Sequence, residues 1–267
     1  MSSNGKYALI TGATSGIGYE LAKLFAKDGY NLVIVSRNED NLQTTSNELS
    51  SANGIEVVTI SKDLSQPKAP LELYEEVKAK GIQVDVLVND AAQGQYGLFV
   101  ETDIQRELEI VHLNIGAYLI LTKMFLKDMV ARNDGKILQV ASIGGKLPGP
   151  YQSVYHATKA FIVSHSESLA NELKDTGVTI TALLPGPTDT DFFNKAEMED
   201  TKMVQEGSLS DPAKVAKDGY EALMSGKSEI ISGLKNKFQV GMSHVLPEAM
   251  VAENIHKQME PSEKGNK

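Results

Sequence analysis

Short apolar runs alternate with longer amphipathic segments along the chain. The apolar runs lack the polar alternation of a half-exposed strand, which is typical of strands buried on both faces of a parallel sheet. The predicted strands are residues 7–11, 31–35, 55–60, 84–88, 136–141, 178–184 and 228–231. The pattern therefore predicts an α/β chain with a Rossmann-type, doubly wound, seven-stranded parallel sheet and helices on both faces.

The segments between the apolar runs carry apolar residues at helical spacing. They predict helices at residues 19–27, 38–51, 67–80, 103–113, 115–131, 153–174 and 212–224. Asn114 interrupts one such stretch and suggests a local bulge or a bound water, with a plain surface asparagine as the alternative. We expect one dinucleotide-binding domain over residues 1–267, with its core at 7–232, a mobile lid at about 188–207 and a charged C-terminal segment at 233–267.

Three glycines, Gly12, Gly16 and Gly18, follow the first predicted strand. A strand, a glycine-rich loop and a helix form the first half of a dinucleotide-binding unit. Glycines let the backbone approach a pyrophosphate, and the N-terminus of the helix offers free N–H groups to it. The alternative is a tight strand-to-helix turn without a ligand.

Residues suited to a binding site follow six of the predicted strands. They are Gly12, Arg37, Asp63, Asn89, Ser142 and Pro185. The carboxyl ends of parallel strands meet at one edge of a sheet, and ligands bind there in this architecture. The sequence therefore predicts a site at that edge.

Ser36 and Arg37 stand after the second strand, where an NAD site usually has an acidic residue. A guanidinium suits a phosphate better than a hydroxyl, so this pair favours NADP(H) as the cofactor. The alternative is a solvated surface arginine, and Glu39 and Asp40 are close in sequence.

Tyr155 and Lys159 lie one helical turn apart on one face of a predicted helix. An ammonium near a phenol favours the phenolate, so we expect the pKa of Tyr155 to fall toward neutral pH and Tyr155 to act as a general acid or base. Two further Tyr-x-x-x-Lys pairs, at 19–23 and 74–78, lie in ordinary amphipathic helices and are interpreted as surface pairs.

Composition narrows the class of protein. Hydrophobic residues make up 41% and charged residues 23%, which is ordinary for a globular protein, and the net charge of −9 argues against nucleic acid as a partner. The chain contains no cysteine and its five histidines show no metal-site spacing, so no metal is expected. Without a signal peptide or an apolar run of about 20 residues, the default is a cytoplasmic enzyme with no membrane partner.

Taken together, the motifs resemble those of the short-chain dehydrogenase/reductase family, in its single-domain, NADP-preferring branch. The matching motifs are Thr11-Gly12-x-x-x-Gly16-Ile17-Gly18, Asn89-x-Ala91, Asn114, Ser142, Tyr155-x-x-x-Lys159 and Pro185-Gly186 with Thr190. The family usually has Asn-Asn-Ala-Gly where this chain has Asn-Asp-Ala-Ala. Because an ionised Asp90 accepts but does not donate hydrogen bonds, and Ala92 is less free than glycine, this departure bears on local stability.

The resemblance implies a role for each catalytic residue. Tyr155 would donate the proton in reduction and accept it in oxidation, and Lys159 would lower the pKa of Tyr155 and bind the nicotinamide ribose. Ser142 would orient the substrate oxygen, and Asn114 would hold a water in a proton relay behind Lys159. The implied cofactor contacts are Gly12, Thr14, Ser15, Gly16, Ile17, Gly18, Ser36, Arg37, Asn38, Asp63, Leu64, Asn89, Ala91, Tyr155, Lys159, Pro185, Gly186, Thr188 and Thr190.

The predicted function is that of an NADP(H)-dependent oxidoreductase that interconverts a carbonyl and an alcohol, with a small molecule as substrate. The expected substrate contacts are Ser142, Tyr151, Tyr155 and Phe192, in an at least partly apolar pocket. An equal alternative is that the aromatic residues only pack the lid. The alternative is a catalytically silent NADP-binding sensor or scaffold protein. Helices 103–131 and 153–174 are apolar on several sides, so we expect a homodimer or homotetramer.

Overall fold

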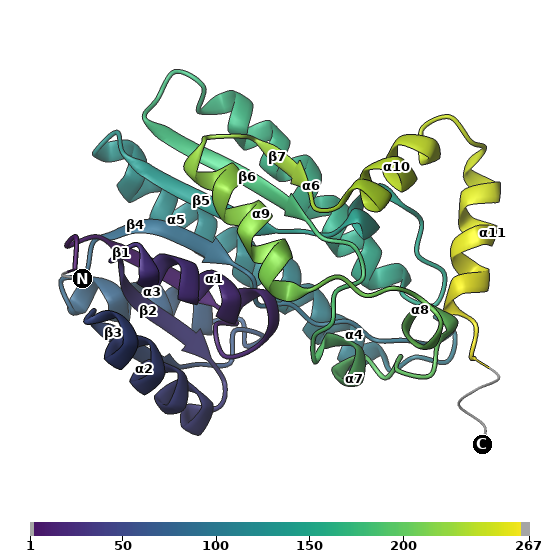
Figure 1. The fold of residues 1–267 in the computed structure, drawn as a ribbon, viewed down its shortest axis with the longest axis horizontal. Helices are drawn as coiled ribbons and strands as arrows, with labels where there is room; N and C mark the ends of the chain where they lie inside the picture. The colour runs from purple at the N-terminus through teal and green to yellow at the C-terminus, as the bar shows by residue number, and fades with distance from the viewer. Residues whose placement is uncertain (1–2, 263–267) are drawn as a thin grey trace.

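The computed structural model describes residues 3–262 of the chain. Its centre is a seven-stranded parallel sheet with the strand order β3-β2-β1-β4-β5-β6-β7 (Figure 1). The strands are β1 (Tyr7–Thr11), β2 (Asn31–Ser36), β3 (Val57–Ser61), β4 (Val84–Asn89), β5 (Gly135–Val140), β6 (Val178–Leu184) and β7 (Glu229–Ile231). The predicted doubly wound, seven-stranded parallel sheet is confirmed.

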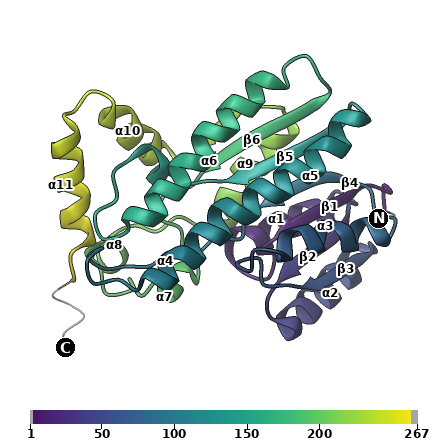
Figure 2. The same cartoon turned by 180° about the vertical axis from the view of Figure 1, so that it is seen from behind.

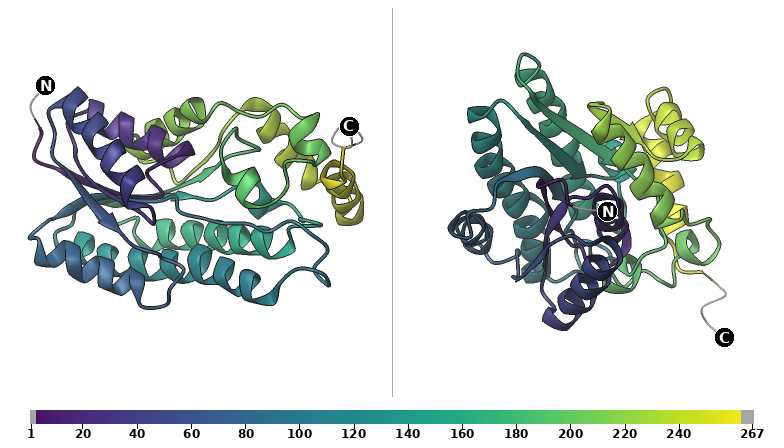
Figure 3. Two further views of the ribbon diagram at one scale, coloured as in Figure 1. Left: turned by 90° about the horizontal axis from the view of Figure 1, so that it is seen from below. Right: turned by 60° about the vertical axis from the view of Figure 1, so that its left-hand side comes forward.

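Helices cover both faces of the sheet (Figure 3). One layer contains α1 (Gly16–Lys27), α2 (Glu39–Asn53) and α9 (Pro212–Met224). The other contains α3 (Ala69–Ala79), α5 (Tyr118–Ala131) and α6 (Ser153–Glu172). Successive residues of a strand point to opposite faces.

Strand β1 shows how the two layers share one sheet. Ala8 and Ile10 pack with the α1 layer, and Leu9 between them packs with the α3 layer. All three side chains are fully buried. This is why the strand appears in the sequence as a continuous apolar run.

The predicted irregularity at Asn114 is confirmed as one π-helical turn, His112–Ala117, between α4 (Ile104–Val111) and α5. The continuous helical stretch from Ile104 to Ala131 is long and apolar enough to cross a membrane by length and composition alone. That measure is weak for a single helix, because a core helix passes it too. Leu121 and Phe125 are buried in the core, which accounts for the apolar character of this stretch.

Four helices without a clear pattern in the sequence lie at the edge of the sheet toward which the strand arrows point (Figures 1 and 2). In the predicted lid, α7 (Phe192–Lys195) and α8 (Lys202–Gln205) are short. In the predicted charged segment, α10 (Leu234–Ser243) and α11 (Glu248–Met259) bury Val240, Ile255 and Met259 in a core cluster. The charged segment is therefore largely helical and packed up to Met259, and its last residues, 263–267, lie outside the described residues.

Candidate active site

One cavity of about 300 Å³ opens at the carboxyl edge of the sheet and runs from the glycine turn to α11. It brings together most of the residues that the sequence singled out. These are Gly12, Thr14, Ser15, Gly16, Ile17, Ser36, Arg37, Asp63, Leu64, Ala91, Ser142, Tyr155, Lys159, Pro185, Gly186, Thr188, Thr190 and Phe192. Residues from β1, β2, β4, β5 and β6 meet here because their carboxyl ends share this edge.

Five of the predicted residues do not line this cavity. Asn38 caps α2 by accepting a hydrogen bond from the Asn41 N–H, and the Asn89 side chain donates to Thr122 and Gln139 inside the sheet layer. Gly18 packs against the Gly12 carbonyl and Asp90. The amide of Asn114 is hydrogen-bonded to protein groups. The Tyr151 ring stacks on Tyr96 and contacts the His256 ring. Tyr151, an expected substrate contact, therefore does not line the cavity.

The glycine turn has no room for side chains. Gly12 and Gly16 have φ values of +73° and +56°, in the left-handed region that favours glycine. A Cβ at Gly18 would lie 2.5 Å from both the Gly12 carbonyl oxygen and Asp90 Oδ2. The bare backbone and the N-terminus of α1 together form a cradle that fits a pyrophosphate.

Cations and hydroxyls surround the far end of the cavity. Thr14 Oγ1 donates to Ser36 Oγ at 3.1 Å, and Arg37 is exposed at the end of β2. Lys62, which the sequence analysis did not single out, lines the same end from β3. Lys62 follows β3 and comes close to Arg37 because β3 pairs with β2. The sequence does not show this pairing, so it did not single out Lys62.

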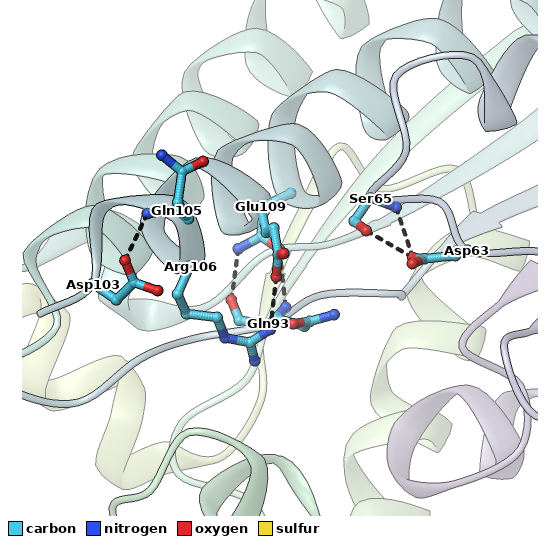
Figure 4. A network of polar contacts seen from close by, with 8 residues as sticks. Asp63, Ser65, Gln93, Asp103, Gln105, Arg106 and Glu109 are labelled. Atoms are coloured by element: carbon cyan, nitrogen blue, oxygen red, sulfur yellow. Dashed lines mark hydrogen bonds and ion pairs between the residues drawn. The ribbon is translucent and has the colours of Figure 1, made fainter.

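Asp63 is held beside these cations. Figure 4 shows Ser65 turned toward the Asp63 carboxyl, which accepts hydrogen bonds from the Ser65 N–H and hydroxyl. Burial acts to raise the pKa of Asp63, but the Ser65 hydrogen bonds and the charge of Arg37 outweigh it and leave the pKa below its usual range. Asp63 is therefore an anionic acceptor near the expected adenosine end.

Tyr155, Ser142 and Lys159 meet at the other end of the cavity. Lys159 Nζ lies 5.7 Å from the centre of the Tyr155 ring and donates to the Val140 carbonyl at 2.8 Å. Ser142 Oγ accepts from the Gly144 N–H at 3.0 Å, which fixes the hydroxyl at the start of a short 3₁₀ turn. This arrangement presents one phenol and one hydroxyl to a bound oxygen atom.

The expected lowering of the Tyr155 pKa is wrong for this structure. Burial raises the pKa of Tyr155 to about 12, although the Ser142 hydroxyl acts to lower it, and the charge of Asp90 raises it further. Burial also lowers the pKa of Lys159 to about 8, against the charge of Asp90. Desolvation outweighs the cation one turn away, whose ammonium is engaged by a backbone carbonyl.

Asp90 is the departure from the usual family motif, and its carboxyl lies between the glycine turn and Lys159. Burial raises its pKa to about 7, and the charge of Lys159 and the Gly18 N–H act to lower it. Its own N–H donates to Thr11 Oγ1 at 3.1 Å. The site therefore holds an additional ionisable group that packs against the cofactor cradle and interacts electrostatically with Lys159.

Asn114 joins the loop after β4 to α6. Its amide accepts from the Gln93 N–H at 3.0 Å and donates to the Gln93 carbonyl at 2.9 Å and to Thr158 Oγ1 at 3.0 Å. A second cavity of about 10 Å³ lies between Asn114 and Lys159. This is close to the space that one water needs.

The two other Tyr-x-x-x-Lys pairs have carboxylate partners outside the cavity. Tyr19 donates to Glu48, and Lys23 pairs with Glu20. Tyr74 and Lys78 both contact Asp128. They are surface pairs, as interpreted from the sequence.

The sequence analysis missed the outer wall of the cavity. Met203, Ile255, Gln258 and Met259 line it from α8 and α11. His156 lines it as well, and its ring packs against Gly144 and Gly149. Within the described residues no group of three or more His, Cys, Asp or Glu side chains could hold a metal ion.

A sequence model of the family described as short chain dehydrogenase matches residues 6–201. The chain belongs to the short-chain dehydrogenase family. The match spans the glycine turn, Ser142, Tyr155 and Lys159, so the cavity coincides with the part of the chain that defines the family. Members of this family are oxidoreductases that typically use NAD(P)(H).

Curated relatives of the chain include a reductase and an oxidoreductase. Very-long-chain 3-oxoacyl-CoA reductase of Rattus norvegicus is 33% identical over 187 residues, which cover 68% of this chain and 59% of the relative. Oxidoreductase UcpA of Escherichia coli (strain K12) is 30% identical over 260 residues, covering 92% and 97% of the two chains. The chain thus spans about 60% of the reductase and nearly all of UcpA.

A short-chain dehydrogenase from Sphingobium yanoikuyae, solved in complex with NADPH, has the same fold with a TM-score of 0.80. It is 25% identical, and the match covers 93% of this chain and 99% of the other.

Proposed function

We propose that this short-chain dehydrogenase is an NADP(H)-dependent oxidoreductase that interconverts a carbonyl and an alcohol, with Tyr155 as the general acid and base. The observation that carries the proposal is the meeting of Tyr155, Ser142 and Lys159 in the cavity that also contains the glycine turn. An expected alternative, a silent NADP-binding sensor or scaffold, does not need an intact set of Asn114, Ser142, Tyr155 and Lys159.

The cofactor residues would work as follows. The glycine turn and the N-terminus of α1 hold the pyrophosphate, and Arg37, with Lys62 nearby, binds a phosphate on the adenosine ribose. Lys159 and Tyr155 face the nicotinamide ribose. When bound, NADPH supplies the hydride. The preference for NADP(H) over NAD(H) rests on Arg37, because Lys62 is already paired with Glu72 and Glu76 and Asp63 is engaged by Ser65.

The protein residues would handle the oxygen and its proton. Ser142 donates a hydrogen bond to the substrate carbonyl and fixes its position. Tyr155 donates its proton to the oxygen as negative charge develops there. A phenol with a pKa of about 12 stays protonated at neutral pH, so the site is prepared for reduction. Lys159 and a water beside Asn114 would return the proton to Tyr155.

The experiment is a screen of ketones and aldehydes with NADPH and NADH, followed at the nicotinamide absorbance. Tyr155→Phe keeps the ring and its packing but removes the transferable proton. We expect kcat to fall by about 10²–10⁴-fold while NADPH still binds. As a control, Tyr19→Phe removes a phenol outside the cavity and should keep its turnover. Near-wild-type kcat in Tyr155→Phe would refute the proposed mechanism.

A further inference from the structure

The inner part of the cavity contains two buried side-chain amides, Gln93 and Gln152, that the proposed chemistry does not use. Both line the cavity, and they are 7% and 4% exposed. Gln93 Oε1 is buried and has no hydrogen-bond partner among the described residues. A buried acceptor without a partner costs free energy, so its presence in a cavity points to a ligand that supplies a donor.

Gln152 has the complementary shortfall. Its Nε2 donates to the thioether sulfur of Met198 at 3.2 Å, and a thioether is a weak acceptor. The two amides therefore offer one unpaired acceptor and one poorly paired donor. If the oxygen and nitrogen of either side-chain amide were exchanged, the two residues together would still offer a donor and an acceptor.

The two amides lie beside the reacting end of the cavity. Gln152 precedes Tyr155 by one turn at the start of α6. A Cβ on Gly94, the residue after Gln93, would lie 3.2 Å from Gln152 Nε2 and 2.8 Å from the Phe192 ring. The Phe192 ring is 5.0 Å from that of Tyr155.

The Gln93 backbone is held firmly, because Asn114 binds both its N–H and its carbonyl. The side chain therefore projects from a fixed point. The surrounding wall is apolar and contains Phe193, Met198, Met203, Ile255 and Met259.

We propose that Gln93 and Gln152 form a second polar subsite for a hydroxyl group on the substrate, so that the substrates are hydroxyketones, or the corresponding diols, on an otherwise apolar frame. A hydroxyl both donates and accepts a hydrogen bond, so it suits a subsite that offers an unpaired acceptor and a poorly paired donor. The bound hydroxyl does not react. This inference rests on the proposed function and assigns its substrate class.

The test compares aryl ketones that carry a hydroxyl on the first, second or third carbon from the carbonyl with analogues that have a methyl in its place. A site built to bind a hydroxyl rejects the analogue that lacks it. We expect wild-type kcat/KM with NADPH to favour the hydroxyketone by at least about 10-fold at one or more spacings.

Gln93→Met and Gln152→Met keep the length of the side chain and remove the hydrogen bonds. Each should reduce the preference for the hydroxyketone by at least about fivefold. Gln43→Met is the matched control: Gln43 is exposed on α2, outside the cavity, and its amide already donates to Asn47. It should keep the wild-type preference. Thermal melting checks that each variant folds, and Gln152→Met carries the test if Gln93→Met does not fold.

Two results would overturn the subsite: equal or better use of the methyl analogues at all three spacings, or a preference that survives in both variants. Either leaves the proposed function standing, because ketones are still reduced. If neither class of ketone oxidises NADPH or NADH, the proposed function and this inference fail together.

Discussion

Three ionisable side chains, Asp90, Tyr155 and Lys159, lie together at the reacting end of the candidate active site. Tyr155, with a pKa of about 12, is neutral at physiological pH. The pKa of Asp90 is about 7 and that of Lys159 is about 8, so both groups titrate near physiological pH. The charge of each group shifts the pKa of the other. The residues that face Asp90 are Gly12 and Gly18 from the turn and Lys159 and Tyr155 from α6, so these two are its ionisable neighbours. The protonation of this site therefore depends on pH in the range where the enzyme would work.

Asp90→Asn should change this pH dependence. The charge of Asp90 raises the pKa of Lys159 and of Tyr155, so its removal should lower both. We expect the limb of the kcat/KM profile that reports Lys159 to move to lower pH by at least about half a unit. Asp191→Asn, which removes a carboxylate paired with Lys195 on the lid, is the control. An unchanged profile in Asp90→Asn would mean that Asp90 and Lys159 are not coupled.

The stability of Asp90→Asn should also depend on pH. The pKa of Asp90 is raised on folding from 3.8 to about 7, so the folded state binds its proton more tightly than the unfolded state between these values. The wild type therefore loses stability from this group as pH rises from about 4 to 7, and the asparagine variant does not. The Tm of the variant relative to wild type should rise by at least about 2 °C between pH 5 and pH 8. A constant difference would contradict a raised pKa.

Arg37 decides between the two nicotinamide cofactors in our proposal. Arg37→Asp removes the cation that would bind the ribose phosphate and introduces a group suited to ribose hydroxyls. We expect kcat/KM for NADPH to fall by at least about 10-fold relative to that for NADH. Arg106→Asp makes the same charge change on α4, outside the cavity, and should leave the ratio as it is (Figure 4). Equal efficiency of the wild type with both cofactors would refute the preference.

At the scale of elements, the π turn His112–Ala117 connects the sheet to the site. An extra residue in this turn directs Asn114 inward, where its amide satisfies the backbone of Gln93. The loop after β4 thus takes its shape from a helix that lies later in the chain. The position of Gln93 follows from this contact.

Asn114→Ala should destabilise the protein. It leaves the N–H and carbonyl of Gln93 without partners, and each unpaired buried group costs about 1–3 kcal/mol. We expect an unfolding free energy lower by about 2–4 kcal/mol, measured by urea denaturation. Asn47→Ala, on the exposed face of α2, should change it by less than about 0.5 kcal/mol. A loss of the same small size in Asn114→Ala would show that water replaces the amide.

At the scale of the whole molecule, several apolar residues are left at the surface of α5 and α6. Two apolar residues of these helices belong to the protein's own core: Phe125 is buried in it and Leu169 packs against it. Ile115, Leu119, Val154 and Phe161 are half-buried. The Phe161 ring stacks on His165 and meets Tyr118 edge-on. This is a surface that a second copy of the chain would cover.

We expect a homodimer or homotetramer by light scattering at micromolar concentration. Phe161→Glu places a charge on the α5–α6 surface and should shift the mass toward the monomer. Phe238→Glu makes the same change at an exposed position of α10 and should leave the mass as it is. A monomeric wild type would refute the prediction, and a monomer in Phe238→Glu alone would place the interface on α10.

The sequence was a good guide where structure depends on local pattern. The strands β1 and β6 and the helix α9 have the bounds that their apolar periods and flanking Gly and Pro residues predict. The glycine turn and the pairing of Tyr155 with Lys159 were visible too, because both are set by spacing within one turn or one helix.

The sequence by itself determined the fold class, the sheet edge that holds the site and the residues that face each other across one helical turn, because short-range geometry is carried by spacing. The tertiary structure decided what depends on contacts between distant segments. Helices α10 and α11 escaped prediction because exposed apolar residues, Leu234 and Phe238 in α10 and Met250 in α11, interrupt the pattern of their buried faces. Asp90 comes near Lys159, and Gln93 lines the cavity, because the loop after β4 and helix α6 meet at one edge of the folded sheet. The pKa of Tyr155 moved opposite to the expected direction because spacing reveals a neighbouring charge, whereas desolvation depends on everything that folds around it.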